Sequence, residues 1–80
     1  MLKNVTKDQF AEDGDNLKVT HVPTGQWFSS YAYDNPPDLK CPSHKGGLEV
    51  DRDKDGNDFS PEEIEGVATE LLRDLLKRRS

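Results

Sequence analysis

The chain has 80 residues, of which 11 are Lys or Arg and 16 are Asp or Glu, and its net charge is −5. This length allows one small domain with a thin core, which excludes a large buried pocket with a catalytic floor. At 31% hydrophobic and 34% charged residues the sequence excludes a membrane span of about 20 apolar residues, and the acidic balance makes nucleic acid an unfavourable partner.

Residues 1–15 are open to two interpretations. Thr6 and Gln9 have the spacing of a helix capping box, and Gly14 is a typical helix terminator. These features predict a short helix at 7–13. The alternative is a flexible tail, because isolated helices of this length are weak.

Residues 17–22 and 26–33 predict a β-hairpin, because both stretches are rich in β-branched or aromatic side chains. Pro23-Thr24-Gly25 predicts a three-residue turn, which would place Val22 opposite Gln26. In that register one face of the hairpin carries Leu17, Val19, His21, Trp27, Ser29, Tyr31 and Tyr33, and the other carries Val22, Phe28 and Ala32.

A two-stranded hairpin is marginally stable alone and needs a further strand and a helix. Residues 48–50 (Leu-Glu-Val) are the candidate third strand. The preceding residues 34–47 are rich in proline and glycine, which is typical of a loop.

The clearest prediction is a helix at 61–78. Ser60 is a suitable N-cap, Pro61 suits the first helical position, and Glu63 completes a capping box. Acidic residues lie near its start and basic residues near its end, as the helix dipole favours. One apolar stripe follows the helical period, formed by Ile64, Val67, Ala68, Leu71, Leu72, Leu75 and Leu76.

Together these elements predict a single α+β domain over residues 1–80, in which a small antiparallel sheet packs against one C-terminal helix. The apolar residues Leu75 and Leu76 exceed what three strands would cover. We therefore expect either a monomer or a homodimer formed through the helix.

The segment from Asp51 to Glu62 resembles the calcium-binding loop of EF-hand proteins. The resemblance places oxygen ligands at Asp51, Asp53, Asp55 and Glu62, and the turn glycine at position 56. The proline and glycine before the loop exclude an entering helix, so a paired EF-hand is not expected. The loop is therefore either a lone Ca²⁺ site or a solvated acidic turn before the helix.

Other candidate chemistry is sparse. Cys41 and His44 have the spacing of half a zinc site, for which His21 is the other available ligand. A Cys–His nucleophile would need an orienting group and an oxyanion site, and the sequence offers neither. We interpret His21 as a packed, hydrogen-bonded side chain, and we expect no enzymatic activity.

The hairpin carries more aromatic residues than one helix can cover, and exposed apolar patches usually mark partner surfaces. The candidate binding residues are Val22, Trp27, Phe28 and Tyr31. We expect a non-catalytic module that binds another protein through an open sheet face or edge; the alternative is that the N-terminal segment covers this patch. A DNA-binding sheet is a weaker alternative, because Lys18 is the strands' only Lys or Arg.

The His-x-Pro-Thr-Gly hairpin at 21–25, the acidic turn at 56–59 and the terminal amphipathic helix resemble those of a group of short bacterial proteins without an assigned activity. The resemblance implies a bacterial origin and carries no catalytic residue over. The first eight residues lack the apolar core of a signal peptide, and the single cysteine excludes an internal disulfide. We therefore expect a cytoplasmic protein.

Overall fold

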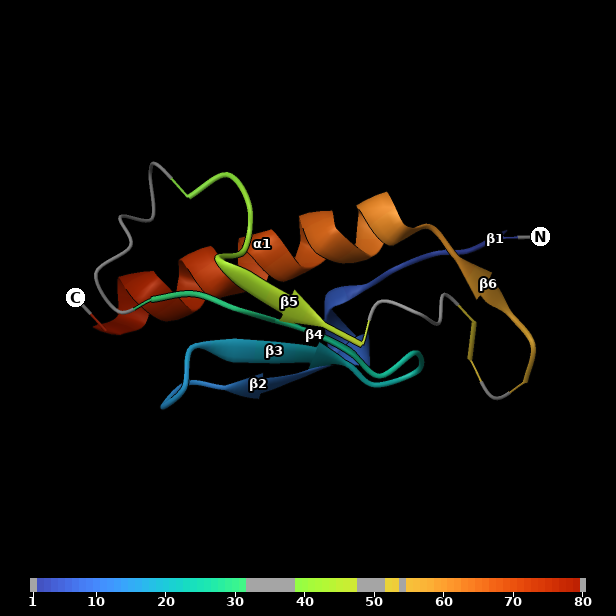
Figure 1. Cartoon of the computed structure of the whole chain (residues 1–80), viewed down its shortest axis with the longest axis horizontal. Helices are drawn as coiled ribbons and strands as arrows, with labels where there is room; N and C mark the ends of the chain where they lie inside the picture. The colour runs from blue at the N-terminus through green and yellow to red at the C-terminus, as the bar shows by residue number, and fades with distance from the viewer. Residues whose placement is uncertain (1, 32–38, 48–51, 54, 80) are drawn as a thin grey trace.

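A computed structural model describes residues 2–31, 39–47, 52–53 and 55–79. It contains a four-stranded antiparallel sheet in which neighbours in the chain are neighbours in space, with the order β2-β3-β4-β5. The predicted α+β class is confirmed, because helix α1 packs against one face of this sheet (Figure 1). The elements are β1 (Leu2–Lys3), the 3₁₀ turn η1 (Lys7–Gln9), β2 (Phe10–Asp13), β3 (Lys18–His21), β4 (Gln26–Ser29), β5 (His44–Gly46), β6 (Asp58–Phe59) and α1 (Pro61–Arg79).

Helix α1 confirms the predicted helix at 61–78 to within one residue. At its start the Ser60 hydroxyl donates to Glu62 (3.0 Å), and the Ser60 carbonyl accepts the Ile64 amide (3.1 Å). Leu75 and Leu76 are buried within the chain. They therefore do not form the exposed apolar surface on which the expectation of a helix-mediated homodimer was based. The buried stripe of the helix consists of Ile64, Ala68, Leu71, Leu72, Leu75 and Leu76.

The hairpin is present, but its predicted register is wrong. His21, rather than Val22, pairs with Gln26, so the turn has four residues. Within this turn the His21 carbonyl accepts the amides of Thr24 (3.2 Å) and Gly25 (2.7 Å), and Gly25 has a φ of 78° that suits glycine. If one strand shifts by one residue against its partner, each of its side chains shares a face with a different set of side chains on the partner strand.

The corrected register defines an inner and an outer face of the sheet. Val19, His21, Gln26 and Phe28 are buried on the inner face, beneath α1. Phe28 is only 1% exposed, whereas Val22 at the turn is 63% exposed. The expectation that Val22 and Phe28 share an open face is therefore wrong.

The predicted N-terminal helix at 7–13 is also wrong. The helical part ends after the three residues of η1, and Phe10–Asp13 continue as β2, an edge strand paired with β3. The Thr6 hydroxyl donates to the Asp8 carboxylate and does not cap the turn. Burial of Phe10 in the core outweighs the local helical signals.

The opposite edge of the sheet is formed by a second strand that was not expected, β5. It pairs with β4 and lies in the stretch predicted to be a loop. The candidate strand at 48–50 lies outside the described residues. Both edge strands are linked to α1 by ion pairs, from Glu12 to Arg78 (3.1 Å) and from Lys45 to Glu65 (3.4 Å). The helix therefore spans the inner face from one edge to the other.

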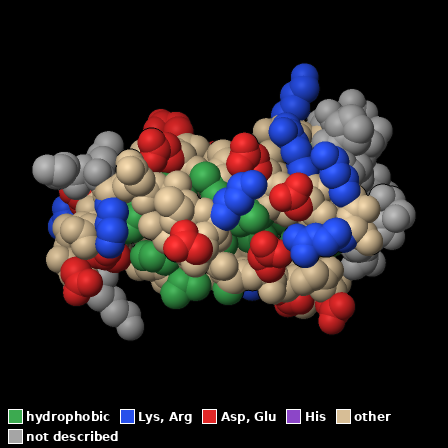
Figure 2. Space-filling view, turned by 180° about the vertical axis from the view of Figure 1, so that it is seen from behind, with side chains coloured by type: hydrophobic (Ala, Val, Ile, Leu, Met, Phe, Trp, Pro, Cys, Tyr) green, Lys and Arg blue, Asp and Glu red, His purple; other side chains and the backbone are tan. Residues whose placement is uncertain are grey.

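The face seen from behind in Figure 2 is mixed: hydrophobic side chains emerge between acidic and basic ones over its middle. In the C-terminal half of α1, Arg73 Nε donates to the Leu39 carbonyl (2.6 Å). This bond holds the chain at Leu39 against the helix. No helix within the described residues is long and apolar enough to cross a membrane.

The observed register predicts a large difference between two truncations. Phe28→Ala should lower the free energy of unfolding by about 3–5 kcal/mol, because it empties a buried site beneath α1. Val22→Ala should change it by less than about 0.5 kcal/mol, because the side chain is exposed at the turn. Urea unfolding of both variants measures this difference. Equal losses for the two variants would contradict the register.

Candidate binding surface

The outer face of the sheet faces away from α1. Alternation along the strands places Trp27 and Ser29 of β4 on this face, because Gln26 and Phe28 point inward. Thr20 lies opposite Trp27 on β3, and Gly46 lies opposite it on β5. Trp27 therefore stands at the centre of the outer face.

Trp27 lies flat against the sheet because β5 carries a glycine at this position. A Cβ atom at Gly46 would lie 2.4 Å from the indole ring, which is closer than any real contact. On β3 the Lys18 ammonium lies 5.0 Å from the ring centroid, a cation–π contact. The indole is thus held between a glycine and a cation, and it stays half-buried.

Tyr31 and His44 extend the aromatic surface away from Trp27. Their rings meet edge to face with centroids 4.9 Å apart, and the Tyr31 hydroxyl is hydrogen-bonded to His44 Nε2. Tyr31 is 42% exposed and His44 is exposed. We call Trp27, Tyr31 and His44 the aromatic band.

The structure brings together only part of the predicted binding set. Trp27 and Tyr31 contribute to the aromatic band, Val22 is exposed at the turn, and Phe28 belongs to the core. His44 and Gly46 also belong to this surface, but the sequence does not reveal them, because they fall in a stretch rich in proline and glycine. Residues 44–46 (His-Lys-Gly) have no alternation of apolar and polar side chains that would indicate a strand.

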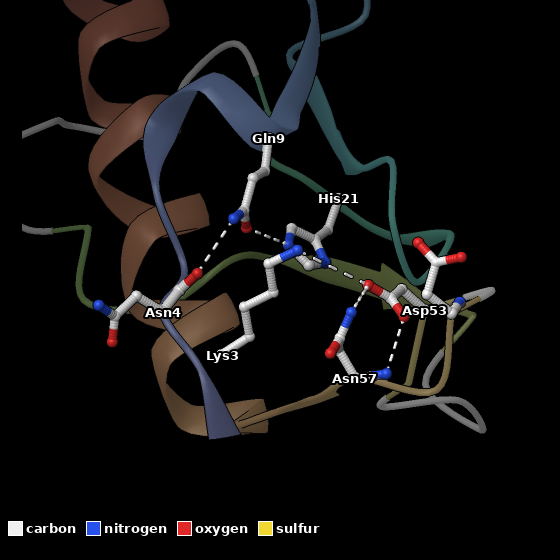
Figure 3. A network of polar contacts seen from close by, with 7 residues as sticks. Lys3, Asn4, Gln9, His21, Asp53 and Asn57 are labelled. Atoms are coloured by element: carbon white, nitrogen blue, oxygen red, sulfur yellow. Dashed lines mark hydrogen bonds and ion pairs between the residues drawn. The ribbon is translucent and has the colours of Figure 1, made fainter. Parts of the chain in front are cut away.

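At the end of the sheet near the hairpin turn, the buried His21 forms the centre of a polar network (Figure 3). Its Nδ1 lies 2.8 Å from the Thr24 hydroxyl, and its Nε2 lies 2.8 Å from Gln9 Oε1. Gln9 Nε2 in turn donates to the Asn4 carbonyl (3.0 Å). The rings of Phe10 and Phe59 pack against the imidazole, each with its centroid 4.9 Å away.

The network assigns the proton of the neutral imidazole. Gln9 Oε1 accepts from Nε2–H, so Nδ1 accepts from the Thr24 hydroxyl. Burial lowers the pKa of His21 below its ordinary value of 6.5, because the cation would lose its hydration. These contacts confirm the interpretation of His21 as a packed, hydrogen-bonded side chain, which joins the N-terminal segment to the hairpin turn.

The described part of the acidic segment forms a compact turn around Asp53. Its Oδ1 accepts the amides of Asp55 (2.9 Å) and Asn57 (2.8 Å), and its Oδ2 accepts Asn57 Nδ2 (3.0 Å) and lies 4.0 Å from Lys3 Nζ (Figure 3). Hydrogen bonds from Asn57 are the main cause that lowers the pKa of Asp53. Protein donors therefore already use both oxygens of this carboxylate.

Of the other predicted calcium ligands, Asp55 and Glu62 are exposed, and Asp51 lies outside the described residues. Across the described ranges no three His, Cys, Asp or Glu side chains gather in a metal-binding arrangement. Calcium binding at 51–62 stays a prediction.

The candidate zinc ligands are not brought together. His21 is buried on the inner face, where protein groups contact both of its ring nitrogens, whereas His44 is exposed beside Tyr31. Cys41 is a free, exposed thiol. The sheet therefore separates the two imidazoles that a shared zinc ion would require.

Comparison with models of known protein families, with curated proteins and with solved structures found no match. The functional inference therefore depends on the geometry of the chain itself.

Gly46→Ala should displace the Trp27 ring, because the added Cβ would occupy the space of the indole. We expect a loss of about 1–3 kcal/mol in the free energy of unfolding, and altered fluorescence and near-UV circular dichroism from the single tryptophan. Gly14→Ala is the matched control, because its Cβ would meet only Leu75 at an ordinary 3.8 Å. An unchanged tryptophan signal in Gly46→Ala would contradict the described packing.

The buried imidazole should make folding sensitive to mild acid. Because the folded pKa of His21 lies below 6.5, the unfolded chain binds the proton more tightly. The contribution of the neutral imidazole to the free energy of unfolding should therefore be complete above about pH 6.5. It should fall as the pH drops from 6.5 toward the folded pKa. Urea titrations between pH 5 and 7 measure this slope, which His21→Gln should reduce. Equal slopes for the wild type and His21→Gln would refute the assignment.

Proposed function

We propose that this chain is a small, non-catalytic binding module that holds a segment of another protein against the outer face of its sheet. The observation that carries the proposal is the aromatic band, in which an indole held over Gly46 continues into the exposed Tyr31–His44 pair. Tryptophan and tyrosine are enriched in protein interfaces, because they provide large contact areas with little loss of rotamer freedom.

The size of the face favours a linear segment as the occupant. Strands of four residues are about 13 Å long, and four strands spaced about 4.8 Å apart span about 14 Å. This footprint is well below the roughly 800 Å² that each partner buries in a standard interface between folded proteins. An extended segment of a few residues, with an apolar or aromatic side chain against Trp27, fits this area.

The charges of the face favour protein over nucleic acid. Lys18 is a cation on the described outer face, but its ammonium is placed over the Trp27 ring, and Asp13 lies opposite it on β2. Single-stranded nucleic acid is bound by aromatic side chains within a positively charged groove. The net charge of −5 opposes such a groove.

Site-specific photo-cross-linking tests the proposal. A photoreactive amino acid replaces Thr20, the residue opposite Trp27, and the chain is irradiated in cells of its source organism. We expect a discrete adduct with one protein that withstands nuclease. Trp27→Ala should reduce its yield at least tenfold, because the ring is the main contact, and should leave the fold intact.

The matched control places the same photoreactive group at Asp74, on the exposed side of α1, where we expect no adduct with that protein. An adduct that nuclease removes would replace the proposal with nucleic-acid binding. Equal adducts with the same protein from positions 20 and 74, or an adduct that survives Trp27→Ala, would also refute it.

A further inference from the structure

A second surface lies on the side of α1, away from the outer face of the sheet. The segment just after β1 and the first half of the helix enclose an open groove of about 510 Å³. Its apolar part is formed by Val5 and Val67, which are half-buried and pack against the edge of the core. Gly66 lies beside them.

Gly66 has no packing role within the described chain. A Cβ atom at this position would meet nothing within 4 Å, and the residue is exposed. A glycine in a helix interior is unfavourable compared with alanine, and no contact within the described chain explains its presence here. A residue without a side chain permits another helix to approach α1 closely.

The rim of the groove is acidic. Glu63 and Glu70 lie one on each side of Gly66 along the helix, and both are exposed. Lys7 lies 3.9 Å from Glu70, but both side chains are more than half exposed, and such pairs contribute little to stability. A cationic partner therefore replaces this contact at little cost.

We propose that this groove binds an amphipathic helix of a partner protein that carries Lys or Arg beside its apolar residues. The apolar side chains contact Val5 and Val67, the helix backbone approaches Gly66, and the cations pair with Glu63 and Glu70. The net charge of −5 adds long-range attraction for such a partner. The groove and the aromatic band are separate surfaces, so one chain can hold two partners at once.

Nuclear magnetic resonance on the full chain tests this proposal with a defined probe. The probe is a short synthetic amphipathic helix of lysine, leucine and alanine, and the reference peptide has glutamate in place of every lysine. We expect the lysine peptide to shift the amide signals of Val5, Gly66 and Val67 most strongly, and the glutamate peptide to leave them unchanged.

The double substitution Glu63→Lys and Glu70→Lys should lower the affinity for the lysine peptide about tenfold, because two exposed ion pairs become repulsive. The matched charge reversal Asp55→Lys, in the exposed turn around Asp53 and outside the groove, should leave the affinity unchanged. Gly66→Trp should abolish the shifts by filling the groove. Gly66→Ala tests the integrity of the helix, and should raise the melting temperature by about 4–8 °C.

Shifts that spread over other acidic surfaces, no shift at millimolar peptide, or an affinity unchanged by the groove substitutions would overturn the proposal. Trp27→Ala separates it from the function proposed for the outer face. This variant should bind the lysine peptide normally, so either proposal can be refuted without the other.

Discussion

The structure depends on one pairing, that of His21 with Gln26 across the hairpin turn. This pairing decides which side chains of β3 and β4 face the helix. It places Val19 and Phe28 in the core and leaves Trp27 outside. If the strands slipped by one residue, the alternating pattern of one strand would be reversed, and a side chain such as Phe28 would leave the core.

The elements whose signals are local and repeated are predictable from the sequence. Helix α1 has a cap, a sustained apolar period and charges that match its dipole, so it was found to within one residue. The hairpin was found because proline and glycine mark its turn. Its register was missed because the same residues fit turns of three or four residues, and Thr24 also bonds His21.

The two edge strands escaped prediction for a different reason. β2 and β5 have four and three residues, and both are defined by pairing with a neighbour and by contacts with α1. Phe10 and Gly46 have roles that only the assembled sheet reveals. Two of the three residues of the aromatic band, Trp27 and Tyr31, are predictable from the sequence. The supporting glycine and the neighbouring imidazole are not, because their roles depend on contacts across strands.

The connectivity of the sheet also implies an order of folding. Each strand of the sheet pairs with its neighbour in the chain, so the loops closed by β2, β3 and β4 are short and form quickly. Docking α1 on β3 instead closes a loop of roughly 50 residues, which carries a larger entropic cost. The hairpins should therefore form first, with Val19 and Phe28 uncovered until the helix arrives. That transient state is the form of the chain most exposed to aggregation.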